Sequence, residues 1–405
     1  MPFDFDEEID RTGTGSVKWA PPRYLPPDAK SRPIPMWVAD MDFRAPQEVV
    51  KALQEAVEHG IFGYDEPQPS FYEAIVQWQR IRHHWTTDPE WIVLTPGVVA
   101  ALFYIIQTFS RPGDSVLMQM PVYRPFHLGA EINDRRVIGV PLERNGGGYG
   151  FDRDRFRQAI APDTKLFILC NPHNPVGKVW TEAELRAMGE ICLERGVLVV
   201  SDEIHQDFVL HRELRHIPFA SLGEEFAQHS IVCGAPSKTF NLAGLNLSHL
   251  FIANAKVREE LRHAMHRTGV HRANTLGTVA CEAAYRHGAP WLDALLEYLR
   301  GNHARLAEEL KRCLPEIGVA PPDSLYLAWL DCAGLGLNGK ELNDFMLRDA
   351  GLWLNRGEEF GPGGEGHMRM NLGCRRALLE QALSQLTRAV ESLRAHRIAQ
   401  PATWR

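Results

Sequence analysis

The most reactive side chain suggested by this sequence is Lys238, which lies in the polar segment 235–244 directly after an apolar run. A lysine held in partly apolar surroundings can have its pKa lowered, and the free amine that results can attack an aldehyde. An isolated lysine at such a position is more often a surface residue that ends a strand. The interpretation of Lys238 as a nucleophile therefore depends on the residues that accompany it.

A carboxylate and an amide follow two other apolar runs. Asp202 ends the run 196–201, which is very apolar for a segment that carries a charge. Such a carboxylate can pair with a protonated pyridine nitrogen, although it could also cap a following helix. Asn174 lies in the loop 171–177, where two Asn-Pro steps fix a turn and direct amides into a crevice. Turn formation alone would also explain this loop.

Two further segments could bind a ligand that carries a phosphate and a flat ring. Gly97 opens a helical pattern, so the amides of Gly97, Val98 and Val99 can hold a phosphate at the positive end of the helix dipole. A single glycine is a weak signal by itself. Tyr123 follows another apolar run, and its ring could stack on a heteroaromatic group, although a lone tyrosine more often belongs to the core.

These segments are connected by short apolar runs that alternate with helical patterns. The runs are 115–118, 165–170, 196–201, 230–234 and 249–253. This alternation predicts a largely parallel sheet with helices on both faces, and such sheets bind ligands outside the carboxyl ends of their strands. One crossover helix is clearly marked, because Thr181 and Glu184 match a capping box and Gly196 follows the helix end.

The chain of 405 residues exceeds what one hydrophobic core usually organises, which predicts two domains. After about Tyr285 the helical patterns lengthen, and the last one has a single apolar face. We expect an N-terminal arm and part of a small domain in residues 1–50, a large domain in 51–285 and a C-terminal small domain in 286–405. The prolines of the arm, Pro21, Pro22, Pro26, Pro27, Pro33 and Pro35, predict an extended segment over a surface.

Composition favours a small-molecule partner in the cytoplasm. The net charge of −7 argues against binding to nucleic acid or to anionic membranes, and no apolar run is long enough for a membrane helix. The seven cysteines are scattered and form no C-x-x-C pair, which suits a reducing compartment. The 17 histidines form no set at metal-ligand spacing, so we expect no metal site.

Taken in order, the segments resemble the pyridoxal-phosphate aminotransferases of the aspartate aminotransferase fold, and more narrowly the cystathionine β-lyase (C–S lyase) branch known as the MalY/PatB family. The resemblance covers nearly the whole chain. It extends to residues 14–19, 36–43, 63–64, 82–85 and 369–373. It implies an α/β fold in which a large domain with a mostly parallel seven-stranded sheet is joined to a smaller α+β domain.

The resemblance also implies roles for particular residues. Lys238 would carry pyridoxal 5'-phosphate as a Schiff base and act in catalysis with Tyr123, which stacks on the ring. Asp202 would bind the pyridine nitrogen, and Asn174 the phenolic oxygen. Further cofactor contacts would come from Gly97, Val98, Val99, His205, Ser237 and, from the neighbouring subunit, Tyr64, with Asn274 and Thr275 less clearly indicated. Substrate would be bound by Arg369, which grips its α-carboxylate, with Asn174 and the backbone near Ala39.

Two positions depart from the aspartate aminotransferase pattern. His205 stands where a tyrosine is usual, as it does in the C–S lyase branch. Asn246 stands where an arginine usually binds the phosphate, which leaves more of that role to Ser237 and to the helix that begins after Gly97.

By this resemblance the protein is a homodimer with shared active sites that acts on a small amino acid. It would cleave cystathionine or a related cysteine thioether to a thiol, pyruvate and ammonia. The main alternative is an aminotransferase that uses a 2-oxo acid, because both reactions begin with the same removal of the α-proton by Lys238. A PLP-binding regulatory protein is a third alternative, since MalY proteins are associated with regulation through protein contact.

Overall fold

The computed structural model describes residues 3–20, 32–145 and 148–399, which form two compact units. The large unit comprises Arg44–Leu296 and Pro322–Leu325, and the small unit comprises Met1–Phe43, Glu297–Pro321 and Tyr326–Arg405. These boundaries lie near residues 43 and 296, whereas the sequence suggested 50 and 285. Four prolines of the predicted arm, Pro21, Pro22, Pro26 and Pro27, lie outside the described residues.

A mixed sheet organises the large unit, and its described part has seven strands in the order β2-β10-β9-β8-β7-β3-β4. Their bounds, in that order, are Ile92–Thr95, Ser248–Phe251, Ser230–Gly234, Leu198–Asp202, Thr164–Cys170, Ser115–Met120 and Arg136–Pro141. Strand β10 is antiparallel to both of its neighbours, and the other pairings are parallel. The five apolar runs of the sequence are all strands of this sheet, which confirms the predicted α/β architecture.

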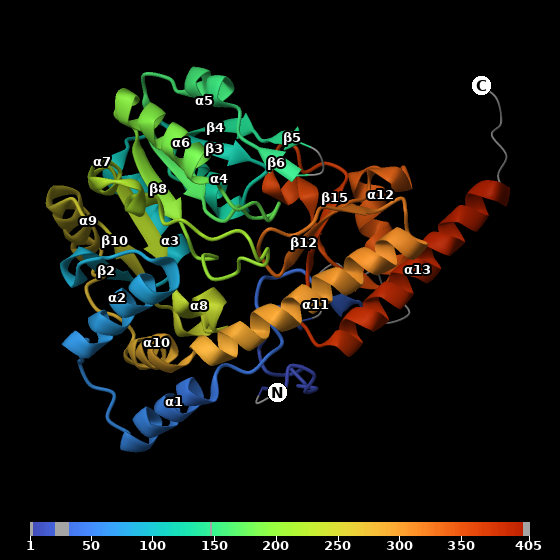
Figure 1. The fold of residues 1–405 in the computed structure, drawn as a ribbon, viewed down its shortest axis with the longest axis horizontal. Helices are drawn as coiled ribbons and strands as arrows, with labels where there is room; N and C mark the ends of the chain where they lie inside the picture. The colour runs from blue at the N-terminus through green and yellow to red at the C-terminus, as the bar shows by residue number, and fades with distance from the viewer. Residues whose placement is uncertain (1–2, 21–31, 146–147, 400–405) are drawn as a thin grey trace. The chain divides into compact units, whose positions relative to one another are not determined.

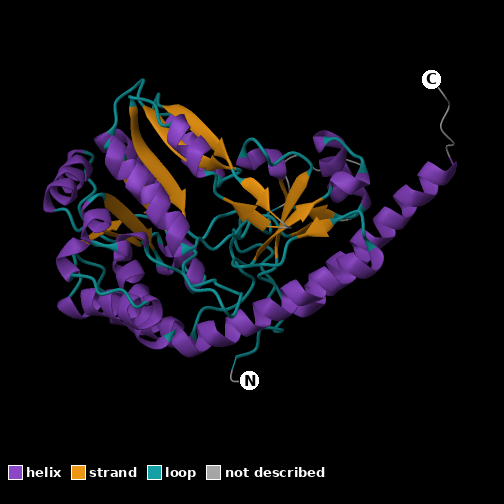
Figure 2. Ribbon diagram, turned by 45° about the horizontal axis from the view of Figure 1, so that its top comes forward, coloured by secondary structure: helices purple, strands orange, loops and turns teal. Residues whose placement is uncertain are grey.

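Helices cover both faces of this sheet because successive strand residues point to opposite sides. Met118 and Ile168 pack with helices α3 (Val98–Phe109), α4 (Arg124–Glu131) and α9 (Ala255–Arg267). Their neighbours Leu117 and Phe167 pack in a second core with α5 (Arg153–Ala159), α6 (Glu182–Arg195) and α7 (Glu224–Gln228). Figures 1 and 2 show the strands running between these helices.

Helix α6 has the ends that the sequence predicts. The Thr181 Oγ1 accepts a hydrogen bond from the Glu184 amide at 3.2 Å, and the Glu184 Oε2 accepts one from the Thr181 amide at 2.9 Å. Gly196 ends the helix with φ +65°, a left-handed conformation that suits glycine. The predicted capping box is therefore confirmed.

The large unit contains several further elements. They are α1 (Gln47–His59), α2 (Pro69–His83), η1 (Pro89–Trp91), the hairpin β5 (Glu143–Asn145) and β6 (Gly148–Gly150), η2 (Phe219–Leu222), α8 (Pro236–Thr239), η3 (Ala243–Leu245) and α10 (Thr275–His287). The sequence predicted a turn at residues 146–148, of which 146 and 147 lie outside the described residues.

The small unit is built around an antiparallel sheet of order β11-β12-β15-β14. Its strands span Gly318–Val319, Leu327–Asp331, His367–Asn371 and Asn355–Arg356, and a separate parallel pair joins β1 (Ile34–Pro35) to β13 (Leu352–Trp353). The remaining elements are η4 (Ala333–Leu335), α12 (Gly339–Asp344), η5 (Phe345–Asp349), η6 (Gly357–Phe360) and α13 (Arg376–Ala399), and the division between the units falls within α11 (Ala289–Cys313).

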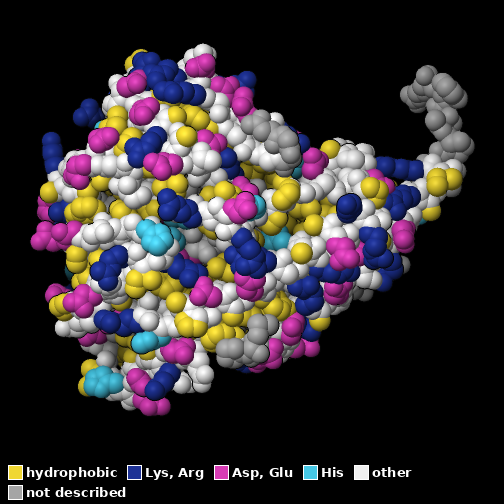
Figure 3. All heavy atoms as spheres, viewed as in Figure 1, with side chains coloured by type: hydrophobic (Ala, Val, Ile, Leu, Met, Phe, Trp, Pro, Cys, Tyr) yellow, Lys and Arg dark blue, Asp and Glu magenta, His cyan; other side chains and the backbone are white. Residues whose placement is uncertain are grey.

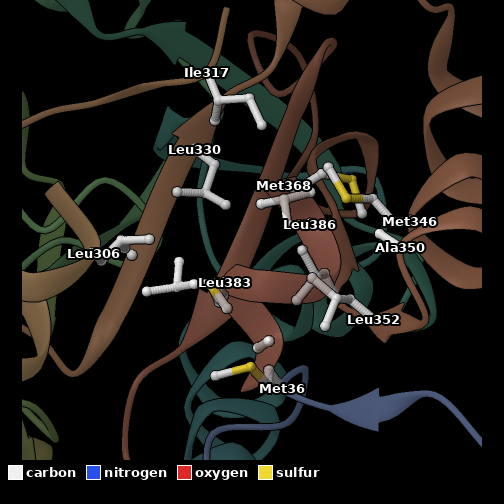
Figure 4. Packing of buried hydrophobic residues seen from close by; sticks show 14 of the residues in the cluster. Met36, Leu306, Ile317, Leu330, Met346, Ala350, Leu352, Met368, Leu383 and Leu386 are labelled. Carbon is white, nitrogen blue, oxygen red and sulfur yellow. The ribbon is translucent and has the colours of Figure 1, made fainter. Parts of the chain in front are cut away.

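The core of the small unit is formed by its sheet and its long helices. Leu330 and Met368 from the sheet pack with Leu383 and Leu386 of α13, and Met36, beside β1, is buried among them (Figure 4). The apolar face predicted for the last helix is the one that packs here. Met36, which directly follows the proline-rich part of the predicted arm, thus belongs to the core of the small unit.

All seven cysteines are free thiols, and six of them are buried. Burial raises the pKa of each of these buried thiols above its ordinary value. No helix in the described part of the chain is both long and apolar enough to cross a bilayer. Figure 3 shows acidic and basic side chains intermingled over the viewed face.

Candidate active site

Four neighbouring strands bring the central candidate residues to one edge of the large sheet. Strands β9, β8, β7 and β3 are adjacent and parallel, so their carboxyl ends lie at the same edge. Lys238 follows β9, Asp202 ends β8, Asn174 follows β7 and Tyr123 follows β3. The sheet therefore gathers the lysine, the carboxylate, the amide and the phenol that the sequence singled out.

Strand β2 leads into α3, and the N-terminus of this helix lies at the same edge of the sheet. It is antiparallel to β10, which is antiparallel to β9, so β2 and β9 run in the same direction. Gly97 then caps α3 with φ +115°, a backbone conformation that strongly favours glycine, and the helix begins at Val98 without a side-chain cap. Amides at an N-terminus that lacks a side-chain cap can bind an anion.

Lys238 lies in α8, a four-residue helix that follows β9 and begins at Pro236. Lys238 and its neighbour Ser237 are both half-buried. The positive charge of Lys238 acts on Asp202, where it favours the ionised carboxylate.

Asp202 is buried at the end of β8, with 4% of its surface exposed. Burial, reinforced by the nearby charge of Glu203, raises the pKa of Asp202 to about 7, although a hydrogen bond from the Ile204 amide at 3.1 Å opposes that shift. A cationic N–H donor placed against this carboxylate would offset its burial. The ionised form of Asp202 is therefore disfavoured unless a positively charged group binds to it.

The residue that follows Asp202 belongs to a buried polar network that the sequence did not indicate. The next residue, Glu203, has no exposed surface, and its carboxylate accepts hydrogen bonds from Ser201 Oγ at 2.8 Å and from the Phe219 amide at 2.8 Å. Its second oxygen lies 2.8 Å from His216 Nε2. These contacts fix the backbone on the carboxyl side of Asp202.

The loop that carries Asn174 is tied to the loop that carries Tyr123. His173 is buried, and its Nε2 lies 2.8 Å from the carbonyl oxygen of Pro121. Burial lowers the pKa of His173 to about 4, so the ring is neutral and donates this hydrogen bond. The backbone N–H of Asn174 in turn donates to Cys170 Sγ at 3.3 Å.

Two predicted substrate-binding positions, Ala39 and Arg369, lie in the small unit. Arg369 is buried in β15, and its Nη2 donates to Asn355 Oδ1 at 2.7 Å and to the Trp37 carbonyl oxygen at 3.0 Å. Its guanidinium also lies 4.8 Å from the centre of the Phe360 ring. These contacts hold the guanidinium in a fixed orientation.

The backbone around Ala39 is held by two residues that the sequence reasoning did not assign a role. The Tyr326 hydroxyl donates to the Ala39 carbonyl oxygen at 2.9 Å. Asn371 Nδ2 donates to the carbonyl oxygens of Val38 and Asp40 at 2.6 and 2.8 Å. Asn371 lies in the motif 369–373, so its position in the sequence was a usable signal.

The other predicted positions lie at separate points of the large unit. Tyr64 is 91% exposed in the segment between α1 and α2, where its ring lies 4.8 Å from the Arg272 guanidinium. Asn274 caps α10, which begins at Thr275. His205 is buried in the turn after β8.

The position that lacks the usual arginine is exposed. Asn246 ends η3 with φ +48°, and its side chain lies 3.5 Å from the Gly244 carbonyl oxygen. Among the described residues, no group of three or more His, Cys, Asp or Glu side chains could hold a metal ion.

The family described as aminotransferase class I and II matches residues 34–386. The chain belongs to this family. It is 43% identical to the cystathionine beta-lyase PatB of Bacillus subtilis, over 96% of this chain and all of that protein, and 33% identical to the protein MalY of Escherichia coli, over 97% and 100%. The PLP-bound C–S lyase of Staphylococcus hominis superposes with a TM-score of 0.88 at 33% identity, over 96% of this chain and 98% of that one. The resemblance to the MalY/PatB branch is thus confirmed.

The residues of this family member fit pyridoxal 5'-phosphate. The Asp202 carboxylate suits a protonated pyridine nitrogen, because that partner would compensate its burial. The start of α3 offers backbone amides for a phosphate. Lys238 stands at the same edge of the sheet with an amine that can bond covalently to an aldehyde. The chain is a PLP-dependent enzyme, and these three groups would hold the cofactor.

Proposed function

We propose that this protein is a C–S β-lyase that acts on cystathionine or a related L-cysteine thioether. The reaction consumes water, breaks the bond between Cβ and sulfur, and releases a thiol, pyruvate and ammonia. The observation that carries the proposal is the set of Tyr123, Asn174, Asp202 and Lys238 at one sheet edge in a chain 43% identical to PatB. The PLP-bound C–S lyase of Staphylococcus hominis has the same fold, which supports the same reaction class.

Bound pyridoxal phosphate supplies an electron sink that lowers the cost of removing the substrate α-proton. Lys238 accepts that proton at its Nζ and delivers a proton to the departing sulfur. The Asp202 carboxylate would hold a positive charge on the ring nitrogen, and Asn174 would donate a hydrogen bond to the phenolic oxygen. Tyr123 would stack on the ring and assist the proton transfers of Lys238.

Substrate orientation is assigned to Arg369 in this proposal. Its planar guanidinium can bind a carboxylate through two parallel hydrogen bonds. Asn355, the Trp37 carbonyl and the Phe360 ring already fix the orientation of that guanidinium. A substrate whose α-carboxylate is fixed would lose the freedom to rotate its Cα–H bond out of the orientation that proton removal requires.

The test is to supply purified holoenzyme with L-cystathionine and to measure free thiol and pyruvate with and without added 2-oxoglutarate. Equal amounts of thiol and pyruvate are expected without any oxo acid. Lys238→Ala is the control, because it removes the amine and keeps the other groups. Turnover that requires 2-oxoglutarate and yields glutamate would instead identify an aminotransferase. Cofactor binding without turnover would favour a regulatory protein.

We further propose that the enzyme works as a homodimer in the cytoplasm. The chain from α1 to α2 exposes several large apolar side chains, among them Ile61 at 70%, Phe62 at 59% and Tyr64 at 91%. Exposed apolar side chains of this size favour a protein interface. The seven free thiols suit a reducing compartment.

A further inference from the structure

Another buried carboxylate, Asp207, lies in the turn after β8, five residues beyond Asp202. Its Oδ1 accepts a hydrogen bond from Trp78 Nε1 at 3.2 Å and lies 2.9 Å from His83 Nε2. Its Oδ2 accepts a hydrogen bond from the Thr239 hydroxyl at 2.6 Å. The reaction described above assigns no role to any of these four residues.

Thr239 directly follows Lys238 and is the last residue of α8. Thr239 has no exposed surface, so its hydroxyl is shielded from competing water. A helix of four residues is too short to be stable by its own hydrogen bonds. The hydrogen bond to Asp207 therefore holds α8 from outside, one residue from the reactive lysine.

The charge state of the cluster favours this hydrogen bond. Burial alone would raise the pKa of Asp207, but its interactions with His83, Thr239 and Arg82 together outweigh burial and lower that pKa. Burial lowers the pKa of His83, so His83 is neutral and donates its Nε2–H to an ionised Asp207. A hydrogen bond to an ionised acceptor is stronger than one between neutral groups.

We propose that Asp207 is a positioning residue that fixes Lys238 through the Thr239 hydroxyl, with Trp78 and His83 holding Asp207 in place. This inference rests on the proposed function, because it concerns the lysine that binds the cofactor. Two donors on Oδ1 prevent the carboxylate from rotating, so Oδ2 stays directed at Thr239. The hydrogen bond between Thr239 and Asp207 thereby anchors the main chain next to Lys238 to the turn that follows Asp202.

The test compares Thr239→Val, which removes the hydroxyl at nearly constant volume, with Thr239→Ser, which keeps it. The matched control is Thr164→Val. Thr164 is also buried, with its hydroxyl 3.0 Å from Ser115 Oγ, but it begins β7 at the opposite end of the strand from Asn174. Both valine variants lose a buried hydroxyl, and only one of the two hydroxyls lies beside Lys238.

The first readout needs no substrate. In holoenzyme, the visible absorption of the lysine–cofactor linkage is titrated with pH. We expect Thr239→Val to move the midpoint by about half a unit or more, because the lysine nitrogen is no longer held in its native surroundings. We expect Thr239→Ser and Thr164→Val to keep the native midpoint. Thermal unfolding of the cofactor-free proteins reports the loss of stability separately.

The second readout is steady-state kinetics. For Thr239→Val we expect kcat to fall about tenfold to a hundredfold with little change in KM, since misplacing a reacting group by a fraction of an ångström affects the chemical step most. Thr239→Ser should restore most of kcat. If Thr239→Val and Thr164→Val lose only thermal stability, with native spectra and native kcat, Asp207 is structural and the inference is overturned.

A variant at the other side of Asp207 covers the case in which Thr239→Val does not fold. Trp78→Phe removes one of the two donors that keep the Asp207 carboxylate from rotating, and it leaves the Thr239 hydroxyl itself unchanged. We expect the spectral midpoint of this variant to move as well, by less than the half unit expected for Thr239→Val. An unchanged midpoint would overturn the inference. Native protein that forms the linkage but releases no thiol would count against the proposed function alone.

Discussion

The Asp202 carboxylate lies in a position where its ionised form is unfavourable until a cationic partner arrives. Its pKa of about 7 in the cofactor-free protein reflects burial above all. The folded pKa is thus raised above the unfolded value near 3.8. Such a group contributes stability below the unfolded pKa, and this contribution is lost as the pH rises through the folded pKa.

A first prediction concerns Asp202→Asn. In the cofactor-free state at pH 8, the variant should be more stable than the native protein by an amount on the order of 4 kcal/mol, because no buried charge remains. The gain should disappear near pH 4, where the native carboxyl is protonated. Thermal unfolding of both cofactor-free proteins at the two pH values measures this. An equal melting temperature at pH 8 would show that the carboxylate is not destabilising.

The same substitution should reduce lyase turnover by several orders of magnitude, since a neutral amide does not hold a positive charge on the ring nitrogen. Cofactor should still bind, as judged by absorption. A loss of less than about tenfold would mean that the partner of the ring nitrogen lies elsewhere. The stability gain and the activity loss together would show that the carboxylate is retained for catalysis.

Local sequence patterns were sufficient to identify the candidate residues that directly follow a strand. Lys238, Asp202 and Asn174 each follow an apolar run, and parallel strands bring such residues to one edge. Asp207 and His83 gave no such signal, because a hydrogen bond between residues more than a hundred positions apart depends on how α2 packs. The roles assigned from the family to individual side chains stay predictions.

At the scale of elements, α6 offers a prediction that concerns stability alone. Thr181→Ala removes the acceptor for the Glu184 amide and should cost about 1 kcal/mol. Thr181→Ser should cost much less, since serine keeps the acceptor. Urea unfolding of the two variants measures the difference. Lyase activity should stay native in both, because the carboxyl ends of the strands are unaffected; a change in kcat would contradict this assignment.

The strands of the large sheet differ in how clearly the sequence marks them. Strands β3, β7, β8 and β9 are nearly wholly buried, so their apolar runs are continuous. Strand β4 lies at an edge of the sheet and contains only one buried residue, which leaves a weaker pattern. The reversed direction of β10 is set by its neighbours on either side and has no local signature.

At the scale of the whole molecule, the proposed homodimer predicts complementation between two impaired chains. If Tyr64 serves the active site of the partner subunit, a mixed dimer of a Lys238→Ala chain and a Tyr64→Phe chain contains one site with both defects and one with neither. Activity above that of either parent is therefore expected on mixing. Homodimers of each variant, unfolded and refolded separately, are the control. Mixtures no more active than their parents would contradict shared sites.

The burial of the cysteines has a consequence for an enzyme whose product is a thiol. Free thiols oxidise in time to disulfides, and these exchange with any protein thiolate that they can reach. Attack requires the thiolate, and burial keeps six of the seven thiols protonated and inaccessible. The fold thus resists mixed-disulfide formation with the compounds that its own turnover generates.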